Sequence, residues 1–158
     1  VARVADTVNG KIGYINHYGV RVINCIFDEA YDMSENRTTA GYYDLQQQMH
    51  WGLVDGKGQN VTDYRFEYAK SFKNGAAVVL YDDRWGYIDS TGNFLFSKNF
   101  DYADNFAKDG LAWVVDGNTM GFVDRKGNMK VKLPKADLYF DLRNNFELKT
   151  STKVTIPK

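Results

Sequence analysis

Four copies of one eight-residue frame recur along the chain and restrict the folds that it can adopt. The frame consists of a large apolar residue, Gly, an aromatic or aliphatic residue, Ile or Val, Asp or Asn, two variable residues and Gly. The copies occupy residues 12–19, 51–58, 85–92 and 120–127, so successive copies begin 39, 34 and 35 residues apart. Periods of this length are typical of stacked supersecondary units, none of which can bury its apolar face alone. The chain is therefore predicted to be a repeat protein.

The polar end of each frame predicts a tight turn. Asp or Asn comes first, where its side chain can accept backbone hydrogen bonds, and Gly follows three residues later, where the backbone needs a positive φ angle. The residues concerned are Asn16 and Gly19, Asp55 and Gly58, Asp89 and Gly92, and Asp124 and Gly127. Because they recur in every unit, we interpret them as structural turn residues.

A second motif follows each of the first three frames. A Phe lies 15 residues after the first position of the frame and opens the pattern Phe-acid-x-Ala, at residues 27–30, 66–69 and 100–103. This segment is predicted to be a compact loop or a single helical turn, and Asn36, Gly75 or Gly110 then provides a left-handed corner into a short strand. With a further strand expected at residues 94–96, each unit is predicted to be a three-stranded antiparallel meander. The fold class is therefore all-β, with tandem meanders in a solenoid-like or blade-like repeat array.

These motifs resemble the WG-repeat family, the bacterial β-repeats named after a Trp-Gly pair. Trp51-Gly52 and Trp85-Gly86 match the pair directly, whereas Ile12 and Met120 replace its Trp. The resemblance covers residues 1–133. It implies a non-catalytic scaffold that mediates interactions, without a defined ligand.

The predicted array occupies residues 1–133 and contains about four repeats. Residues 1–4 match the last strand of a unit and are interpreted as part of a truncated preceding repeat. After Pro134 the pattern stops, so residues 134–158 are expected to form a C-terminal cap or the start of a neighbouring segment. A hairpin around Asn144-Asn145 and an edge strand containing Val154 and Ile156 are expected there.

Composition argues against several classes of partner. Twenty basic and twenty acidic residues give a net charge of zero, so nothing favours nucleic-acid binding, and no apolar run is long enough for membrane insertion. The single cysteine, Cys25, excludes an internal disulfide framework without fixing the compartment. The bacterial cell surface or periplasm is favoured over the cytoplasm.

No residue pattern predicts an enzyme, a cofactor or a metal site. Asp55, Asp89 and Asp124 lie a whole repeat apart and each has a local role in a turn, so no catalytic residue is assigned. The only imidazole or thiol side chains are His17, His50 and Cys25, too few for a four-coordinate zinc site.

Function is expected where the repeats differ. The positions equivalent to Ala77 and Val79 are apolar throughout, including Ala2 and Val4, and are predicted to face inward, whereas Arg3, Val78 and Trp113 vary on the opposite face. About five extra residues lie within residues 40–50. The candidate partner-binding residues are Tyr42, Tyr43, Gln46, Gln47 and Trp113.

Each candidate also has a structural interpretation. Trp113 would also fit packing against an adjacent unit, and residues 40–50 would also fit a tolerated loop insertion. The sequence is interpreted as a non-catalytic protein–protein interaction or scaffold module with an unidentified protein partner. The alternative is glycan or peptidoglycan binding through exposed aromatic residues.

Overall fold

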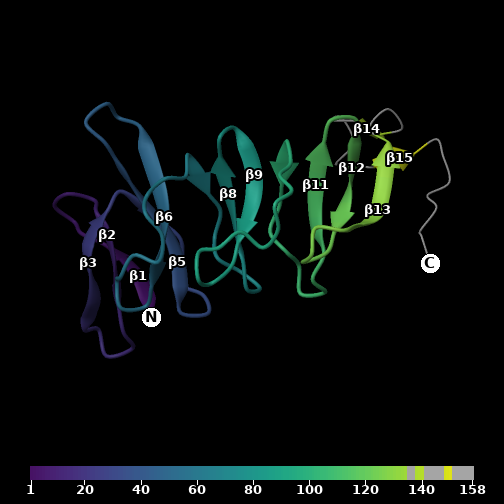
Figure 1. Ribbon diagram of the computed structural model, residues 1–158. Coiled ribbons are helices and arrows are strands. Elements are labelled where there is room, and N and C mark those ends of the chain that lie inside the picture. Colours follow the sequence, from purple (N-terminus) through teal and green to yellow (C-terminus); the bar gives the residue numbers. More distant parts are fainter. Residues whose placement is uncertain (135–137, 141–147, 151–158) are drawn as a thin grey trace.

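The computed structural model describes residues 1–134, 138–140 and 148–150, and these residues form strands and no helix. The prediction of an all-β repeat array is confirmed. Four small antiparallel sheets follow one another in a row from the N-terminus toward the C-terminus, and none closes into a barrel (Figure 1).

Three strands form each of the first three sheets, and four form the fourth. The first sheet contains β1 (Ala2–Ala5), β2 (Ile12–Ile15) and β3 (Arg21–Phe27), and the second contains β4 (Glu29–Ala30), β5 (Arg37–Tyr43) and β6 (Met49–Asp55). The third contains β7 (Tyr68–Ala69), β8 (Ala77–Tyr81) and β9 (Arg84–Ile88). The fourth contains β10 (Tyr102–Ala103), β11 (Ala112–Asp116), β12 (Thr119–Val123) and β13 (Met129–Pro134). A separate pair, β14 (Leu138–Phe140) and β15 (Leu148–Thr150), follows.

One register recurs in all four sheets. The Gly of each frame lies opposite an apolar residue of the preceding strand, in the pairs Val4 and Gly13, Ala40 and Gly52, Val79 and Gly86, and Val114 and Gly121. Each sheet therefore joins the last strand of one sequence unit to the frame of the next. Residues 2–5 pair with β2 in this same register.

Two details of the predicted meander are wrong. Residues 94–96 do not form a strand, because after the turn only Phe94 pairs with Ile88. The Phe-acid-x-Ala segment is not a helical turn but contains a two-residue strand, such as β7. The next residue, Lys70, donates its backbone N–H to Val78 at 2.8 Å, so this backbone is paired with a strand instead of with itself.

The inner sheets are buried on both faces. In β8, Ala77 and Val79 pack against the second sheet, whereas Val78 packs against the fourth and is only 1% exposed. The predicted inward face at Ala77 and Val79 is therefore buried, and the variable face at Val78 is buried as well. The prediction that Ala2 faces inward is wrong, since Ala2 is exposed where no described sheet packs against that side of the first sheet.

The four turns use one hydrogen-bond pattern. The glycines at positions 19, 58, 92 and 127 have φ angles of 78°, 82°, 84° and 81°. The side-chain oxygen of the Asp or Asn at positions 16, 55, 89 and 124 accepts hydrogen bonds from the backbone N–H groups two and four residues later. A Cβ atom on Gly92 would also lie 2.5 Å from Thr62 Cγ2, so this turn is packed as well as left-handed.

The expected C-terminal hairpin lies partly within the described residues. Strands β14 and β15 pair antiparallel, with Leu138 opposite Thr150. The expected turn at Asn144-Asn145 and the expected edge strand at Val154 and Ile156 lie outside the described residues.

Candidate functional site

The second sheet carries an extended hairpin that the other three sheets of residues 1–134 lack. The sequence places Tyr42 and Tyr43 in an inserted loop, but the structure places both in β5, opposite His50 and Met49 of β6. The extra residues therefore lengthen β5 and β6 to seven residues each and leave only residues 44–48 as a turn. The correction has a physical reason, since paired backbone groups satisfy one another whereas a loop would leave them to the solvent.

Asp44 organises the tip of this hairpin. Its Oδ1 accepts the backbone N–H groups of Gln46 and Gln48 at 2.8 and 2.9 Å, and Gln47 takes the left-handed position with φ of 61°. This is the same turn chemistry as in the frames, with Gln in place of Gly. Asp44 Oδ2 also lies 2.8 Å from Nε2 of His50, which holds the imidazole against the tip.

The five candidate contact residues do not form one surface. Tyr42 and Tyr43 are 40% and 48% exposed and, as neighbours in a strand, point to opposite faces. Gln46 and Gln47 are exposed at the tip. Trp113 is half-buried in the fourth sheet, where its ring packs against Phe122 at 5.3 Å between centroids. The third sheet separates it from the hairpin (Figure 1).

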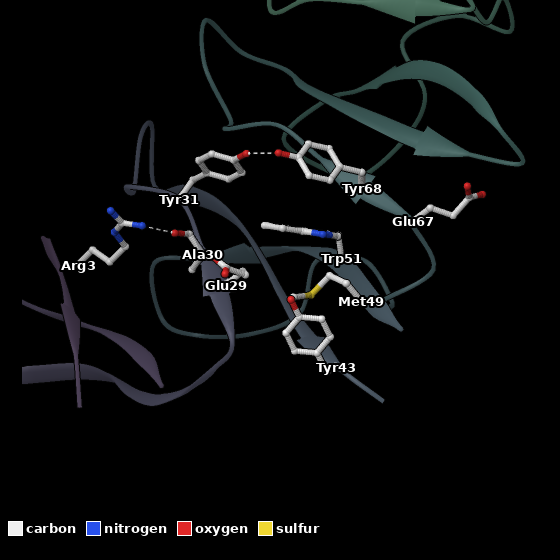
Figure 2. Close-up of a pocket in the computed structure, with 9 residues that line it drawn as sticks. All are labelled: Arg3, Glu29, Ala30, Tyr31, Tyr43, Met49, Trp51, Glu67 and Tyr68. Carbon is white, nitrogen blue, oxygen red and sulfur yellow. Dashed lines mark hydrogen bonds between the residues drawn. The ribbon is translucent and has the colours of Figure 1, made fainter. Parts of the chain in front are cut away.

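Beside the hairpin lies a cavity of about 440 Å³, within the range of small-ligand sites (Figure 2). It is bounded by residues from the first three sheets and from the segments that connect them. Its aromatic walls are Tyr31, Tyr43, Trp51 and Tyr68, its charged residues are Arg3, Glu29 and Glu67, and Ala30 and Met49 complete the lining. Of the residues predicted from sequence, only Tyr43 belongs to it.

Three rings form one continuous wall of this cavity. The Trp51 ring lies 5.6 Å from that of Tyr31 and 5.5 Å from that of Tyr68, and the two tyrosine hydroxyl groups are 2.9 Å apart (Figure 2). Burial, followed by the hydrogen bond with Tyr68, raises the pKa of Tyr31 above its usual value, so this side chain is neutral. Trp51 is only 5% exposed, and its indole N–H has no acceptor among the described residues.

The charges of the cavity are separated along its length. Arg3 lies at one end, where it donates to the carbonyl oxygen of Ala30 at 2.6 Å and pairs with Asp32 at 3.2 Å. Glu67 lies at the other end, beyond Trp51 (Figure 2). Within the described part of the chain, neither Glu67 nor Glu29 forms an ion pair, and Glu67 accepts a long hydrogen bond of 3.4 Å from the backbone of Asp83.

Gly41 allows close packing beside the central ring. It pairs with Trp51 across the hairpin, and a Cβ atom there would lie 2.7 Å from the carbonyl oxygen of His50, 2.9 Å from Met49 Sδ and 3.2 Å from Trp51 Cδ2. The third and fourth sheets carry Leu80 and Val115 at the equivalent position. The sequence patterns did not indicate this cavity, although Gly41 differs from its repeat equivalents.

The acids considered as catalytic candidates are engaged in turns. The backbone N–H of Gln59 holds the pKa of Asp55 below its usual value, and that of Asn128 does the same for the pKa of Asp124. His17 lies in an exposed turn and Cys25 is partly buried in β3. Over residues 1–134 and the two later strands, no three His, Cys, Asp or Glu residues cluster as metal ligands. The same residues contain no helix long and apolar enough to span a membrane.

Comparison with known families agrees with the repeated register. The family described as WG containing repeat matches residues 12–40, 51–85 and 85–119, which is more than half of the chain. The chain belongs to the WG-repeat family. Neither a curated protein nor a solved structure matches it. Family membership accounts for the array of β-repeats, and the WG-repeat family is a non-catalytic repeat family.

Proposed function

We propose that this WG-repeat protein is a non-catalytic protein-interaction module within a larger bacterial assembly or cell-surface protein. The supporting observation is that two departures from the repeat occur side by side. The extended β5–β6 hairpin carries Tyr42, Tyr43, Gln46 and Gln47, and Tyr43, Met49 and Trp51 in its half nearest the turn line the cavity beside it. The other units described in residues 1–134 have neither the extended hairpin nor a glycine opposite the first residue of the frame, where Gly41 faces Trp51.

The chemistry of this surface suits contact with a protein. Tyrosine provides a large contact area with few rotatable bonds, and glutamine provides hydrogen bonds that adapt to a partner.

The glycan alternative has weaker support. Stacking on a sugar needs an accessible aromatic face, whereas Trp51 is almost fully buried. Tyr42 and Tyr43 are accessible but point to opposite faces of β5, so they do not make one platform. Trp113 remains a separate candidate contact, on a different sheet.

The test is a comparative pull-down from the source organism. In one variant, residues 44–48 are replaced by Asn-Gly, which shortens the hairpin to a two-residue turn. The matched control replaces Asp82-Asp83, the two-residue turn of the next hairpin, by the same dipeptide, and melting temperatures check that both variants fold. We expect a partner that the wild type and the control retain and the shortened variant loses.

The proposal fails if the shortened variant, also carrying Tyr43→Ser, retains every partner at wild-type levels. A glycan array with the same proteins addresses the alternative. Hairpin-dependent binding of a glycan, in the absence of a protein partner, would favour it.

A further inference from the structure

An ion pair recurs in the repeats and is broken beside the cavity. The residue before each of the first three frames is basic, namely Lys11, His50 or Arg84. The residue after the Phe of each Phe-acid-x-Ala segment is acidic, namely Asp28, Glu67 or Asp101. In the first sheet, Lys11 Nζ lies 2.6 Å from Asp28 Oδ1, and in the third, Arg84 pairs with Asp101. In the second sheet the basic residue, His50, pairs with Asp44 instead. Glu67 therefore has no cationic partner among the described residues.

A second comparison shows what the repeat places next to its rings. In the third and fourth sheets, the ammonium group of Lys70 lies 5.4 Å from the Trp85 ring centroid and 4.4 Å from that of Tyr102. It donates to Tyr102 Oη at 3.0 Å and to the carbonyl oxygen of Ala103 at 2.8 Å, and it lies 3.3 Å from Asp104 Oδ1. An alkylammonium group is therefore an internal ligand of this Trp–Tyr corner.

The cavity is the equivalent corner one repeat earlier. Trp51 and Tyr68 correspond to Trp85 and Tyr102, and the position of Lys70 is occupied by Tyr31, as the spacing from the preceding Phe shows. Tyr31 is uncharged and bonds to the hydroxyl of Tyr68. The corner thus keeps its rings and Glu67, the equivalent of Asp101, and contains neither of the two cations found in the next unit. The acid beside Lys70 in that unit, Asp104, is not kept, because Lys70 itself occupies the equivalent position.

We propose that the cavity between the second and third sheets binds an alkylammonium group, which lies against the accessible ring of Tyr68 with Glu67 as its counter-ion. A cation is attracted to an aromatic face by the ring quadrupole, and a carboxylate without a partner adds a charge-assisted hydrogen bond. Arg3, the cation at the opposite end, is balanced by Asp32. The inference rests on the proposed function where the ammonium belongs to a lysine of a protein partner.

The same chemistry has two sources, the primary ammonium of lysine and the quaternary ammonium of a methylated lysine. Three peptides separate them: acetyl-Gly-Lys-Gly-amide, the same peptide with trimethyllysine, and the same peptide with Nε-acetyllysine, which has no charge. Each is titrated into the ¹⁵N-labelled full chain, with the Trp51 indole N–H as the reporter. We expect the first two to shift this signal and the acetylated peptide to leave it unchanged, and the tighter of the two identifies the source.

Two variants test the geometry with the peptide that binds. Tyr31→Lys installs the ammonium found at Lys70, and we expect it to occupy the corner and to weaken binding more than tenfold. Glu67→Gln removes the counter-ion, and we expect a loss of about fivefold to tenfold. Asp63→Asn makes the same charge change at an exposed residue outside the cavity lining, and we expect less than a twofold effect.

Equal binding of the acetylated peptide overturns the proposal, as does the absence of any shift at Trp51 with both charged peptides. Equal losses in Glu67→Gln and Asp63→Asn also overturn it, because the attraction would then be unspecific. None of these peptide results tests the binding of a protein partner through the hairpin. If the shortened-hairpin variant loses such a partner, that result still supports the proposed interaction module.

Discussion

The Trp51 corner and the Trp85 corner have the same backbone frame but differ in what their rings contact. At Trp85, Lys70 places an ammonium against the ring and Arg84 pairs with the neighbouring acid. At Trp51, neutral Tyr31 takes the first position and a cavity remains. The register is preserved in both, so a few side chains convert a self-contained packing site into a candidate binding site. Repeats that share a scaffold can therefore differ in function without a change of fold.

The largest expected difference between the corners is in stability. Trp51 is almost fully buried and packs in one cluster with Leu53 and Phe66, so Trp51→Ala should reduce the free energy of unfolding by about 3–5 kcal/mol. Trp85 is only partly buried, so Trp85→Ala should cost about 1–3 kcal/mol. Urea unfolding of both variants measures the difference. Equal losses would mean that burial does not distinguish the two rings.

The next expected effect comes from emptying the Trp85 corner. Lys70→Met keeps the aliphatic contact but removes the ammonium and its hydrogen bonds, and we expect a loss of about 1–2 kcal/mol. The variant should also gain a second, weaker site for the lysine peptide. Lys73→Met, at an exposed position nearby, is the matched control. Stoichiometry that stays at one peptide per chain would contradict the equivalence of the corners.

Closing the Trp51 corner should change stability less than binding. His50→Arg gives this unit the basic residue of the next one, and we expect the guanidinium to pair with Glu67 as Arg84 does with Asp101. Exposed ion pairs contribute about 0–1 kcal/mol, so the melting temperature should change little while the lysine peptide binds more weakly. Thr119→Arg adds the same charge at the equivalent position of the fourth sheet. A similar loss in this control would assign the effect to net charge.

The features of the fold that the sequence predicts are those that recur in every repeat. The turns at Asp89 and Gly92 and the all-β array depend on residues repeated in every unit, and local chemistry alone predicts them. The short strand β7 was missed because its Phe and Ala have the spacing of a helical turn. Only the pairing of Lys70 with Val78, an interaction between strands, decides the backbone there.

The cavity depends on register, which the sequence analysis did not establish. Gly41 matters because it faces Trp51 across the hairpin, and Glu67 matters because His50 turns away from it toward Asp44. The difference between Tyr31 and Lys70 at equivalent positions is the sequence signal for this cavity. Only the fold places the two side chains beside the Trp51 and Trp85 rings.

The smallest expected effect is a pH dependence at the hairpin tip. The hydrogen bond with His50, followed by that from the backbone of Gln48, holds the pKa of Asp44 below its ordinary value of 3.8. Because the folded-state pKa is lowered, the stabilisation by the carboxylate is present above the ordinary value and is lost as pH falls through the folded-state value. Hydrogen exchange at the Gln46 and Gln48 amides should therefore become less protected only below that range.

The turn of the first frame is the natural control for this pH effect. There Asn16 accepts the amides of Tyr18 and Val20 without a titrating carboxylate, so their relative protection should not change over the same range. Asp44→Asn should make the tip behave in the same way while keeping the turn. If the tip loosens with pH in this variant as well, Asp44 is not the titrating group.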